Sequence, residues 1–242
     1  MHNLCFEKFG LQSCYTKVLL EDGELLKERF FALGLSGANI TVPHKEAAFR
    51  ACDWIDEGAK NIGAINTIIN DNGLLKGYNT DAPGFMQAIS EYEKQKVLIF
   101  GAGGTAKAIA YIMTKNGLDV TVLNRSHNRL KDFDFCKAYD WDSFDPTTYD
   151  LVINTTSAGL NDETLPANEN LVKECLQSAK AGVDVIYGKK TPFLKLCEDM
   201  GLGFKDGADM LLYQGVLAFE HFSDFQYSKA EITTTMKKAF EL

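Results

Sequence analysis

Short runs of apolar residues recur through the middle of the chain, and each run is followed by a turn and a stretch of helical pattern. The runs lie at Val97–Phe100, which is uninterrupted, and at Asp119–Leu123, Tyr149–Asn154 and Gly182–Tyr187, which also contain polar residues. An uninterrupted apolar run is typical of a strand that is buried on both faces. Strands of this kind that alternate with helices predict a doubly wound parallel sheet.

The segments on either side of this region carry a more varied pattern. Before it, we expect helices at Leu4–Phe9 and Gly23–Leu33 and from Pro43, strands at Tyr15–Leu20 and Gly37–Val42, a hairpin of Ala64–Ile69 with Leu74–Tyr78, and a helix start at Asn79–Gly84. After it, we expect helices at Met210–Phe222 and Ser228–Phe240. The pattern changes near Asp81 and near Gly207, which predicts one domain of residues 1–82 and 207–242 and a second domain of residues 83–206.

Composition narrows the class of partner. The 242 residues carry a formal net charge of −8, which argues against nucleic acid or an anionic membrane as the main partner, because both require a basic face. No apolar run approaches the ~20 residues of a membrane span, and the amino terminus lacks the pattern of a signal peptide. The six cysteines are scattered without metal-ligand spacing. We therefore expect a cytoplasmic protein without a metal site.

A glycine-rich turn follows the first central strand. Gly101, Gly103 and Gly104, with Ala102 between them, allow the backbone to turn sharply and to approach a ligand closely. The helix that follows would point its free N–H groups and positive dipole end at that ligand, as in dinucleotide-binding proteins. The same turn occurs in α/β proteins that bind no nucleotide, so the motif alone leaves both interpretations open.

The end of the second central strand indicates which dinucleotide would bind. An acidic residue at this position accepts a hydrogen bond from the ribose 2′-hydroxyl of NAD. Here the strand ends at Asn124 and Arg125, with Arg129 one helical turn further on. Guanidinium groups suit a 2′-phosphate, so the pattern favours NADP. The alternative is that both arginines are solvated residues at the start of a helix.

Two residues of the first segment are candidates for proton transfer. Lys45 follows one predicted strand and Asp81 follows another, so both side chains could reach the same cleft at the end of a sheet. The carboxylate would orient the ammonium group. The alternatives are that Lys45 is a solvated lysine and Asp81 a helix cap. His44, which has no Ser or Cys nucleophile to pair with, is more typical of a structural histidine.

Several ordered segments together resemble the shikimate dehydrogenase family. They are Gly37–Lys45, Gly63–Thr67, Gly77–Gly84, Gly101–Gly104, Asn124–Ser126 with Arg129, Asn154–Thr156, Asp184–Tyr187 with Thr191 and Pro192, and Asp206–Gly207 with Met210 and Gln214. The resemblance covers nearly the whole chain. It implies an α/β catalytic domain and a doubly wound, Rossmann-like NADP-binding domain inserted into it.

The resemblance also implies an activity, namely the NADP-dependent, reversible reduction of 3-dehydroshikimate to shikimate in the biosynthesis of chorismate and the aromatic amino acids. Lys45 and Asp81 would be the catalytic pair. The residues expected to contact the substrate are Thr41, Asn66, Asp81, Tyr187 and Gln214. Those expected to hold NADP are Gly101, Ala102, Gly103, Gly104, Asn124, Arg125, Arg129 and Gly207. We expect the protein to be a monomer or a homodimer. A quinate/shikimate dehydrogenase and a non-catalytic NADP-binding regulator of the same fold are the alternatives.

One departure from the family pattern lies at the amino terminus. In the family, a strand and a Ser-x-Ser-Pro segment precede an His-Asn pair, whereas here His2 and Asn3 follow Met1 directly. We therefore expect the native product to start roughly 20 residues upstream, a length sufficient for a strand and a turn. The chain as given is then expected to bind NADP, to bind shikimate poorly, and to self-associate through unpaired strands near Val18 and Ile40.

Overall fold

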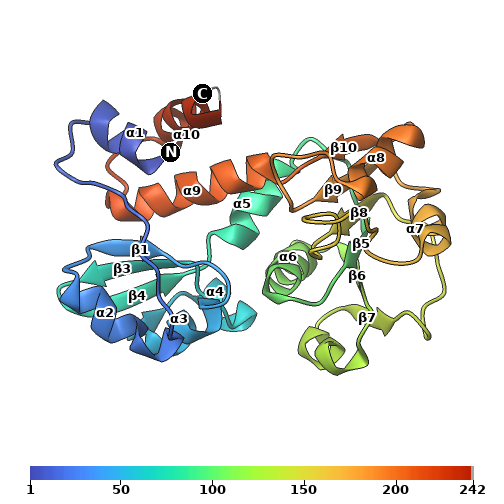
Figure 1. Ribbon diagram of the computed structural model, residues 1–242, viewed down its shortest axis with the longest axis horizontal. Coiled ribbons are helices and arrows are strands. Elements are labelled where there is room, and N and C mark those ends of the chain that lie inside the picture. Colours follow the sequence, from blue (N-terminus) through green and yellow to red (C-terminus); the bar gives the residue numbers. More distant parts are fainter. Residues whose placement is uncertain (241–242) are drawn as a thin grey trace. The chain divides into compact units, whose positions relative to one another are not determined.

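The computed structural model in Figure 1 describes residues 1–240. The chain divides into two compact units: Met1–Gly84 with the segment from Leu211 onward (unit 1), and Phe85–Met210 (unit 2). Both divisions fall inside helices, α5 (Asp81–Ala88) and α9 (Ala208–Phe222). The divisions expected from the sequence, after residues 82 and 206, lie two and four residues earlier, the first at a predicted helix start and the second just before a predicted helix. The hydrophobic pattern does not change within a helix, so it cannot mark a boundary there.

Unit 2 contains a six-stranded, entirely parallel sheet. Its strand order is β10-β9-β8-β5-β6-β7. The strands are β5 (Lys96–Phe100), β6 (Asp119–Asn124), β7 (Lys137–Asp140), β8 (Leu151–Asn154), β9 (Ala181–Asp184) and β10 (Gly203–Lys205). The predicted doubly wound sheet is thus confirmed. The two edge strands, β7 and β10, were not predicted from the sequence, because they are short and only partly buried.

Alternating residues of β5 show how this sheet is covered on both faces. Val97 and Ile99 pack into one core cluster with residues of α6 (Gly104–Lys115) and the 3₁₀ segment η2 (His127–Phe133). Leu98 and Phe100 pack into a second cluster with residues of α7 (Glu169–Leu176) and α8 (Pro192–Asp199). Both faces of the strand are therefore buried, which explains its uninterrupted apolar run.

Unit 1 contains a four-stranded sheet in the order β1-β3-β4-β2. The strands are β1 (Gly37–Asn39), β2 (Trp54–Ile55), β3 (Thr67–Asp71) and β4 (Leu74–Tyr78). The predicted hairpin is confirmed as β3 and β4, joined by Asn72 and Gly73 with φ of +53° and +90°. Positive φ at both residues is typical of the two-residue turns that match the twist of a hairpin.

Helices complete unit 1 in two groups. One group packs on the sheet around the core cluster of Phe30, Ile65 and Ile68, and consists of η1 (Gly23–Leu25), α2 (Leu26–Ala32), α3 (Lys45–Ala51) and α4 (Glu57–Ile62). The other group consists of α1 (His2–Lys8), α9, α10 (Lys229–Lys237) and η3 (Lys238–Phe240), and α1, α9 and α10 share a second cluster around Phe219. Ser228 and Glu231 form a capping box at the start of α10, which confirms the predicted start of that helix.

Three local predictions in unit 1 are wrong. Residues 15–20 form no strand: the backbone N–H and C=O of Tyr15 bond to the Asn3 side chain, and Val18 and Leu19 are exposed. Within residues 1–240, no strand pairs with the apolar residues of this segment. The strand predicted to reach Val42 ends at Asn39, and the helix expected from Pro43 begins at Lys45.

Two further observations concern the chain as a whole. Within residues 1–240, no helix is long and apolar enough to cross a membrane. All six cysteines are free thiols, and burial raises the pKa of Cys136, Cys175 and Cys197 to about 12, whereas Cys14 is exposed.

Candidate active site and nucleotide cavity

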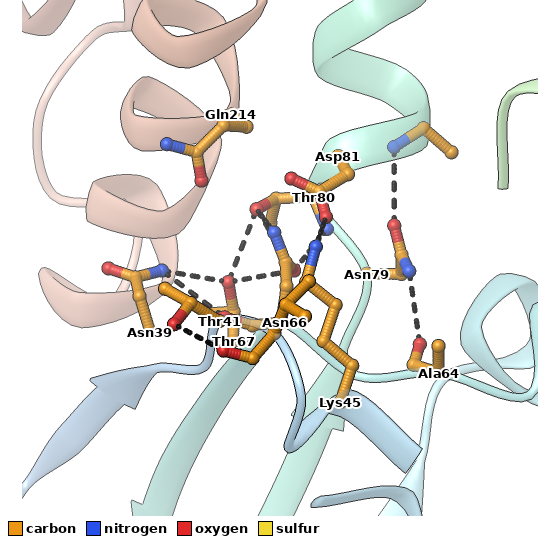
Figure 2. A network of polar contacts seen from close by, with 12 residues as sticks. Asn39, Thr41, Lys45, Ala64, Asn66, Thr67, Asn79, Thr80, Asp81 and Gln214 are labelled. Atoms are coloured by element: carbon orange, nitrogen blue, oxygen red, sulfur yellow. Dashed lines mark hydrogen bonds and ion pairs between the residues drawn. The ribbon is translucent and has the colours of Figure 1, made fainter. Parts of the chain in front are cut away.

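Lys45 and Asp81 form an ion pair in unit 1. Lys45 Nζ donates to Asp81 Oδ2 over 2.6 Å, and the two side chains are 20% and 12% exposed (Figure 2). At this degree of burial the attraction is screened less than at an open surface. The sequence left open whether these residues were a solvated lysine and a helix cap. The structure instead brings them together across 36 residues of chain.

Backbone contacts hold both members of the pair in place. Lys45 is the first residue of α3, and its carbonyl accepts a hydrogen bond from Ile65 N over 3.0 Å. Asp81 is the first residue of α5, where Asn79 Oδ1 accepts from Ala82 N over 3.2 Å. Because Asn79 provides the cap, the Asp81 carboxylate is available to Lys45 rather than to its own helix.

A buried polar network lies beside the ion pair (Figure 2). Asn66 Oδ1 accepts from Thr80 N over 2.7 Å, and Asn66 Nδ2 donates to Thr80 Oγ1 over 2.9 Å. Thr67 Oγ1 lies 3.2 Å from Thr80 Oγ1 and accepts from Asn39 Nδ2 over 3.1 Å. Asn66, Thr67 and Thr80 are almost fully buried. The network therefore fixes the backbone immediately before Asp81.

The other predicted substrate residues are distributed over both units. Thr41 is exposed, and it follows Ile40, whose N–H donates to Asn66 O over 2.7 Å. Gln214 lies on α9, whose backbone passes so close to Gly84 of α5 that a Cβ on that glycine would be 2.7 Å from Gln214 N. Tyr187 belongs to unit 2, where it follows β9 with 57% of its side chain exposed.

Unit 2 contains a cavity of about 680 Å³ at the carboxyl end of its parallel strands. Six of the eight residues predicted to hold NADP line it: Gly101, Ala102, Gly103, Asn124, Arg125 and Arg129. Within residues 1–240 the lining does not include Gly104, the first residue of α6, or Gly207. A Cβ at Gly207 would lie 2.2 Å from Val185 O, so this glycine is required by backbone packing.

The glycine turn fits a closely approaching ligand. Gly101 has a φ of +106°, and a Cβ there would lie 2.7 Å from Thr155 Oγ1. At Gly103 and Gly104, by contrast, a Cβ would meet no atom within 4 Å, so their surfaces face open space above the start of α6. A helix N-terminus behind an open glycine turn suits a phosphate group.

The arginines are available to an anion. Arg125 follows β6 directly, and Arg129 lies in η2, so they stand four residues apart at one edge of the cavity. Within the described part of the chain, neither guanidinium forms an ion pair with a carboxylate. A pair of unneutralised arginines on the edge of a nucleotide cavity fits a 2′-phosphate.

The sequence prediction of the site assigned no binding residue to one wall of the cavity, although Asn154–Thr156 was among the segments that resemble the family. The connection between β8 and α7 supplies Thr155, Thr156, Ser157, Ala158, Asp162, Thr164, Leu165 and Pro166, and the connection after β7 supplies Trp141. Hydrogen bonds from Thr164 and from the backbone of Gly159 lower the pKa of Asp162. The position of the wall could have been predicted, because loops at the carboxyl ends of neighbouring parallel strands meet at one edge.

The features of the two units together indicate the class of protein to which the chain belongs. A parallel sheet with a glycine turn, a cavity at its carboxyl edge and arginines outside any ion pair of residues 1–240 is typical of a dinucleotide-binding unit, and a Lys–Asp pair such as that of unit 1 has the chemistry of a proton donor. The NADP group that the sequence implies is therefore compatible with the residues present.

Comparison with known proteins identifies the family. Two family models match the chain: the shikimate dehydrogenase substrate binding domain at residues 1–68, and shikimate / quinate 5-dehydrogenase at residues 85–175. The shikimate dehydrogenase (NADP(+)) of Helicobacter hepaticus is 46% identical over 236 residues, covering 96% of this chain and 88% of that protein. The chain belongs to the shikimate dehydrogenase family.

Solved structures show the same fold. The shikimate 5-dehydrogenase of Thermus thermophilus, in complex with NADP(H) and shikimate, has a TM-score of 0.82 and 30% identity, covering 98% of this chain and 92% of that one. The shikimate 5-dehydrogenase of Listeria monocytogenes, in complex with shikimate and NAD, has a TM-score of 0.81 and 27% identity, covering 96% of this chain and 89% of that one.

Proposed function

We propose that this protein is an NADP-dependent shikimate dehydrogenase that reversibly reduces 3-dehydroshikimate to shikimate in aromatic amino-acid biosynthesis. The observation that carries the proposal is the 2.6 Å contact of Lys45 and Asp81 in the unit that matches the substrate binding domain. The relatives named shikimate dehydrogenase (NADP(+)) support the choice of substrate and cofactor.

In this proposal the Lys45–Asp81 ion pair carries out the proton transfer of the reaction. NADP, when bound, supplies the hydride acceptor or donor. During reduction, the Lys45 ammonium group donates a proton to the oxygen that develops negative charge, and during oxidation the neutral amine takes it back. Asp81 keeps the ammonium group oriented and lowers the cost of its charge in a partly buried site.

Substrate hydroxyl and carboxylate groups would be held by Thr41, Asn66, Asp81, Tyr187 and Gln214. The two amides support this role, because each side-chain nitrogen carries two N–H groups. Asn66 gives one to Thr80 Oγ1 and Gln214 gives one to Leu211 O, so the second N–H of each can be offered to a ligand.

NADP would be held by the glycine turn and by Asn124, Arg125 and Arg129. Gly104 would contribute its backbone N–H at the start of α6, and Gly207 would act through the packing of the loop after β9. We also propose that the protein acts in the cytoplasm as a monomer or homodimer. Its net charge of −8 supports a location away from nucleic acid and anionic membranes.

A four-way assay tests the proposal. Purified protein is given shikimate or quinate with NADP⁺ or NAD⁺, and formation of the reduced cofactor is followed. We expect the highest kcat/KM with shikimate and NADP⁺. A higher kcat/KM with quinate would favour the quinate/shikimate enzyme. NADP⁺ binding without turnover of either substrate would favour a non-catalytic regulator.

A further inference from the structure

A buried carboxylate with no cationic partner lies below the nucleotide cavity. Asp184, the last residue of β9, is fully buried, and within residues 1–240 no lysine, arginine or histidine forms an ion pair with it. Burial raises the pKa of its carboxyl group above the usual value. An unpaired acid in this position costs folding free energy, so its contacts are informative.

Three hydrogen-bond donors surround the Asp184 carboxylate. Oδ1 accepts from Ile186 N over 3.0 Å, and Oδ2 accepts from Asn154 Nδ2 over 2.9 Å and from Thr191 Oγ1 over 2.7 Å. Asn154 and Thr191 are themselves fully buried. The contact with Asn154 joins the ends of two neighbouring strands, because Asn154 is the register partner of Asp184 in the sheet.

Asn154, held by its contact with Asp184, also forms hydrogen bonds to the wall of the cavity. Its Oδ1 accepts from Thr156 N over 3.0 Å and from Thr156 Oγ1 over 2.8 Å, and Thr156 Oγ1 in turn accepts from Ala158 N over 3.1 Å. Thr156 and Ala158 both line the cavity. The amide of Asn154 can serve both neighbours in one orientation alone, with nitrogen toward Asp184 and oxygen toward Thr156.

The other oxygen of the carboxylate holds the loop after β9. Ile186 is fixed on both sides, because its N–H donates to Asp184 and its carbonyl accepts from Gly207 N over 3.0 Å. Tyr187, the residue proposed to contact the substrate, follows immediately. One carboxylate therefore fixes the start of two loops.

We propose that Asp184 is a positioning residue for the nucleotide site: by accepting from Asn154 Nδ2 it fixes the amide that holds residues 155–158 as a wall of the cavity. The identity of the nucleotide rests on the proposed function, whereas the positioning of the loop does not.

The hydrogen-bond directions predict what two single substitutions do. In Asp184→Asn, the new amide must keep its oxygen toward Ile186 N, so its nitrogen faces Asn154 Nδ2, donor against donor. In Asn154→Asp, two carboxylates face each other. Exchanging the residues, Asn154→Asp with Asp184→Asn, restores the match: the amide at 184 donates to the carboxylate at 154, which still accepts from Thr156. Thr191 Oγ1 then accepts instead of donating.

The experiment uses the full chain in two assays, namely amide hydrogen exchange of residues 155–158 without ligand and calorimetric binding of NADP⁺. We expect each single variant to speed exchange in the loop and to weaken NADP⁺ binding by about tenfold, the loss typical of one hydrogen bond to a charged group. The double variant should return both readouts to within about threefold of wild type, a coupling that additive damage cannot produce.

Two control variants separate positioning from general destabilisation. Val152→Ala removes a buried side chain from the same face of β8, and Thr191→Val removes the Asp184 contact that leads to α8 rather than to the loop. Both should lower the melting temperature and leave exchange in residues 155–158 and NADP⁺ affinity nearly unchanged.

Steady-state kinetics with NADP⁺ as the varied substrate provide a further readout. Asp184→Asn and Asn154→Asp should each raise KM and leave kcat within about threefold.

Several outcomes would overturn the inference. Folded single variants with wild-type exchange in residues 155–158 would do so, as would a folded double variant that exchanges as fast as the singles. If neither single variant folds, a double variant that folds with wild-type exchange supports the inference, and one that does not fold overturns it. If wild-type protein shows the exchange pattern but does not bind NADP⁺, the proposed function fails while the positioning role stands.

Discussion

The candidate active site of unit 1 and the nucleotide cavity of unit 2 are built in different ways. The candidate active site consists of a side-chain ion pair, Lys45 with Asp81, beside buried amides and hydroxyls. The cavity depends mainly on the backbone path, with a glycine turn at Gly101 and a loop held from below by Asn154. Single side-chain changes should therefore reduce the rate in unit 1, whereas in unit 2 they should reduce affinity.

The largest expected effect is the loss of the proton donor. We predict that Lys45→Ala lowers kcat with shikimate by about 10²–10⁴-fold, the usual contribution of general acid–base catalysis, and leaves the Kd of NADP⁺ nearly unchanged. Steady-state kinetics and calorimetry measure the two quantities. The matched control is Lys27→Ala, because Lys27 also pairs with an aspartate, Asp53, but at an exposed position. Near-normal turnover of Lys45→Ala would remove this lysine from the mechanism.

The second effect concerns the choice of cofactor. Replacing Arg125 and Arg129 together with glutamine should weaken NADP⁺ binding by about 10- to 100-fold, because hydrogen bonds to a charged group contribute about 1.5–3 kcal/mol. NAD⁺ binding should change by less than about threefold, since it lacks the 2′-phosphate. Lys131→Gln removes a neighbouring positive charge outside the cavity lining and serves as the control. Equal losses for both cofactors would contradict the assignment.

The smallest effect is a dependence of stability on pH in unit 1. Burial lowers the pKa of His221, which stacks on Tyr78 with ring centroids 3.9 Å apart. A histidine with a lowered pKa binds fewer protons in the folded state, so the free energy of unfolding should fall as pH drops below 6.5, the ordinary pKa of histidine. His221→Gln should reduce this slope in urea titrations between about pH 7 and about pH 5.5, which bracket that pKa, and should leave the part due to His2, whose pKa burial lowers to about 4. An unchanged slope would assign the dependence to other groups.

The two regions also differ in how well the sequence predicted them. The strands around Leu98 and Val152 were predicted because burial on both faces leaves an uninterrupted apolar run. The segment around Val18 also contains consecutive apolar residues, but it is exposed and forms no strand. A strand needs a neighbouring strand to pair with, and the apolar residues of one segment do not reveal whether such a neighbour exists. Edge strand β7 was missed for the opposite reason, since half of its side chains face solvent.

The candidate site shows the same limit at the level of single residues. Lys45 and Asp81 were predicted from their places after strands, yet only the fold brings them within 2.6 Å of each other. The family resemblance included Thr156 in one of its segments but assigned it no binding role, and Ala158 was not singled out, because its position in the cavity wall depends on the backbone path rather than on side-chain chemistry. Asp184 was recognised as part of a motif, but its role depends on hydrogen-bond directions that no spacing encodes.

The thiols described with the fold have a consequence for the redox behaviour of the protein. A thiol reacts with oxidants and alkylating reagents as the thiolate. Burial holds the pKa of Cys136, Cys175 and Cys197 at about 12, so at neutral pH these sulfurs stay protonated as well as shielded. Cys14, on the segment before η1, is exposed to solvent. Oxidative damage to the folded chain should therefore begin at Cys14, while the thiols in the core of unit 2 remain intact.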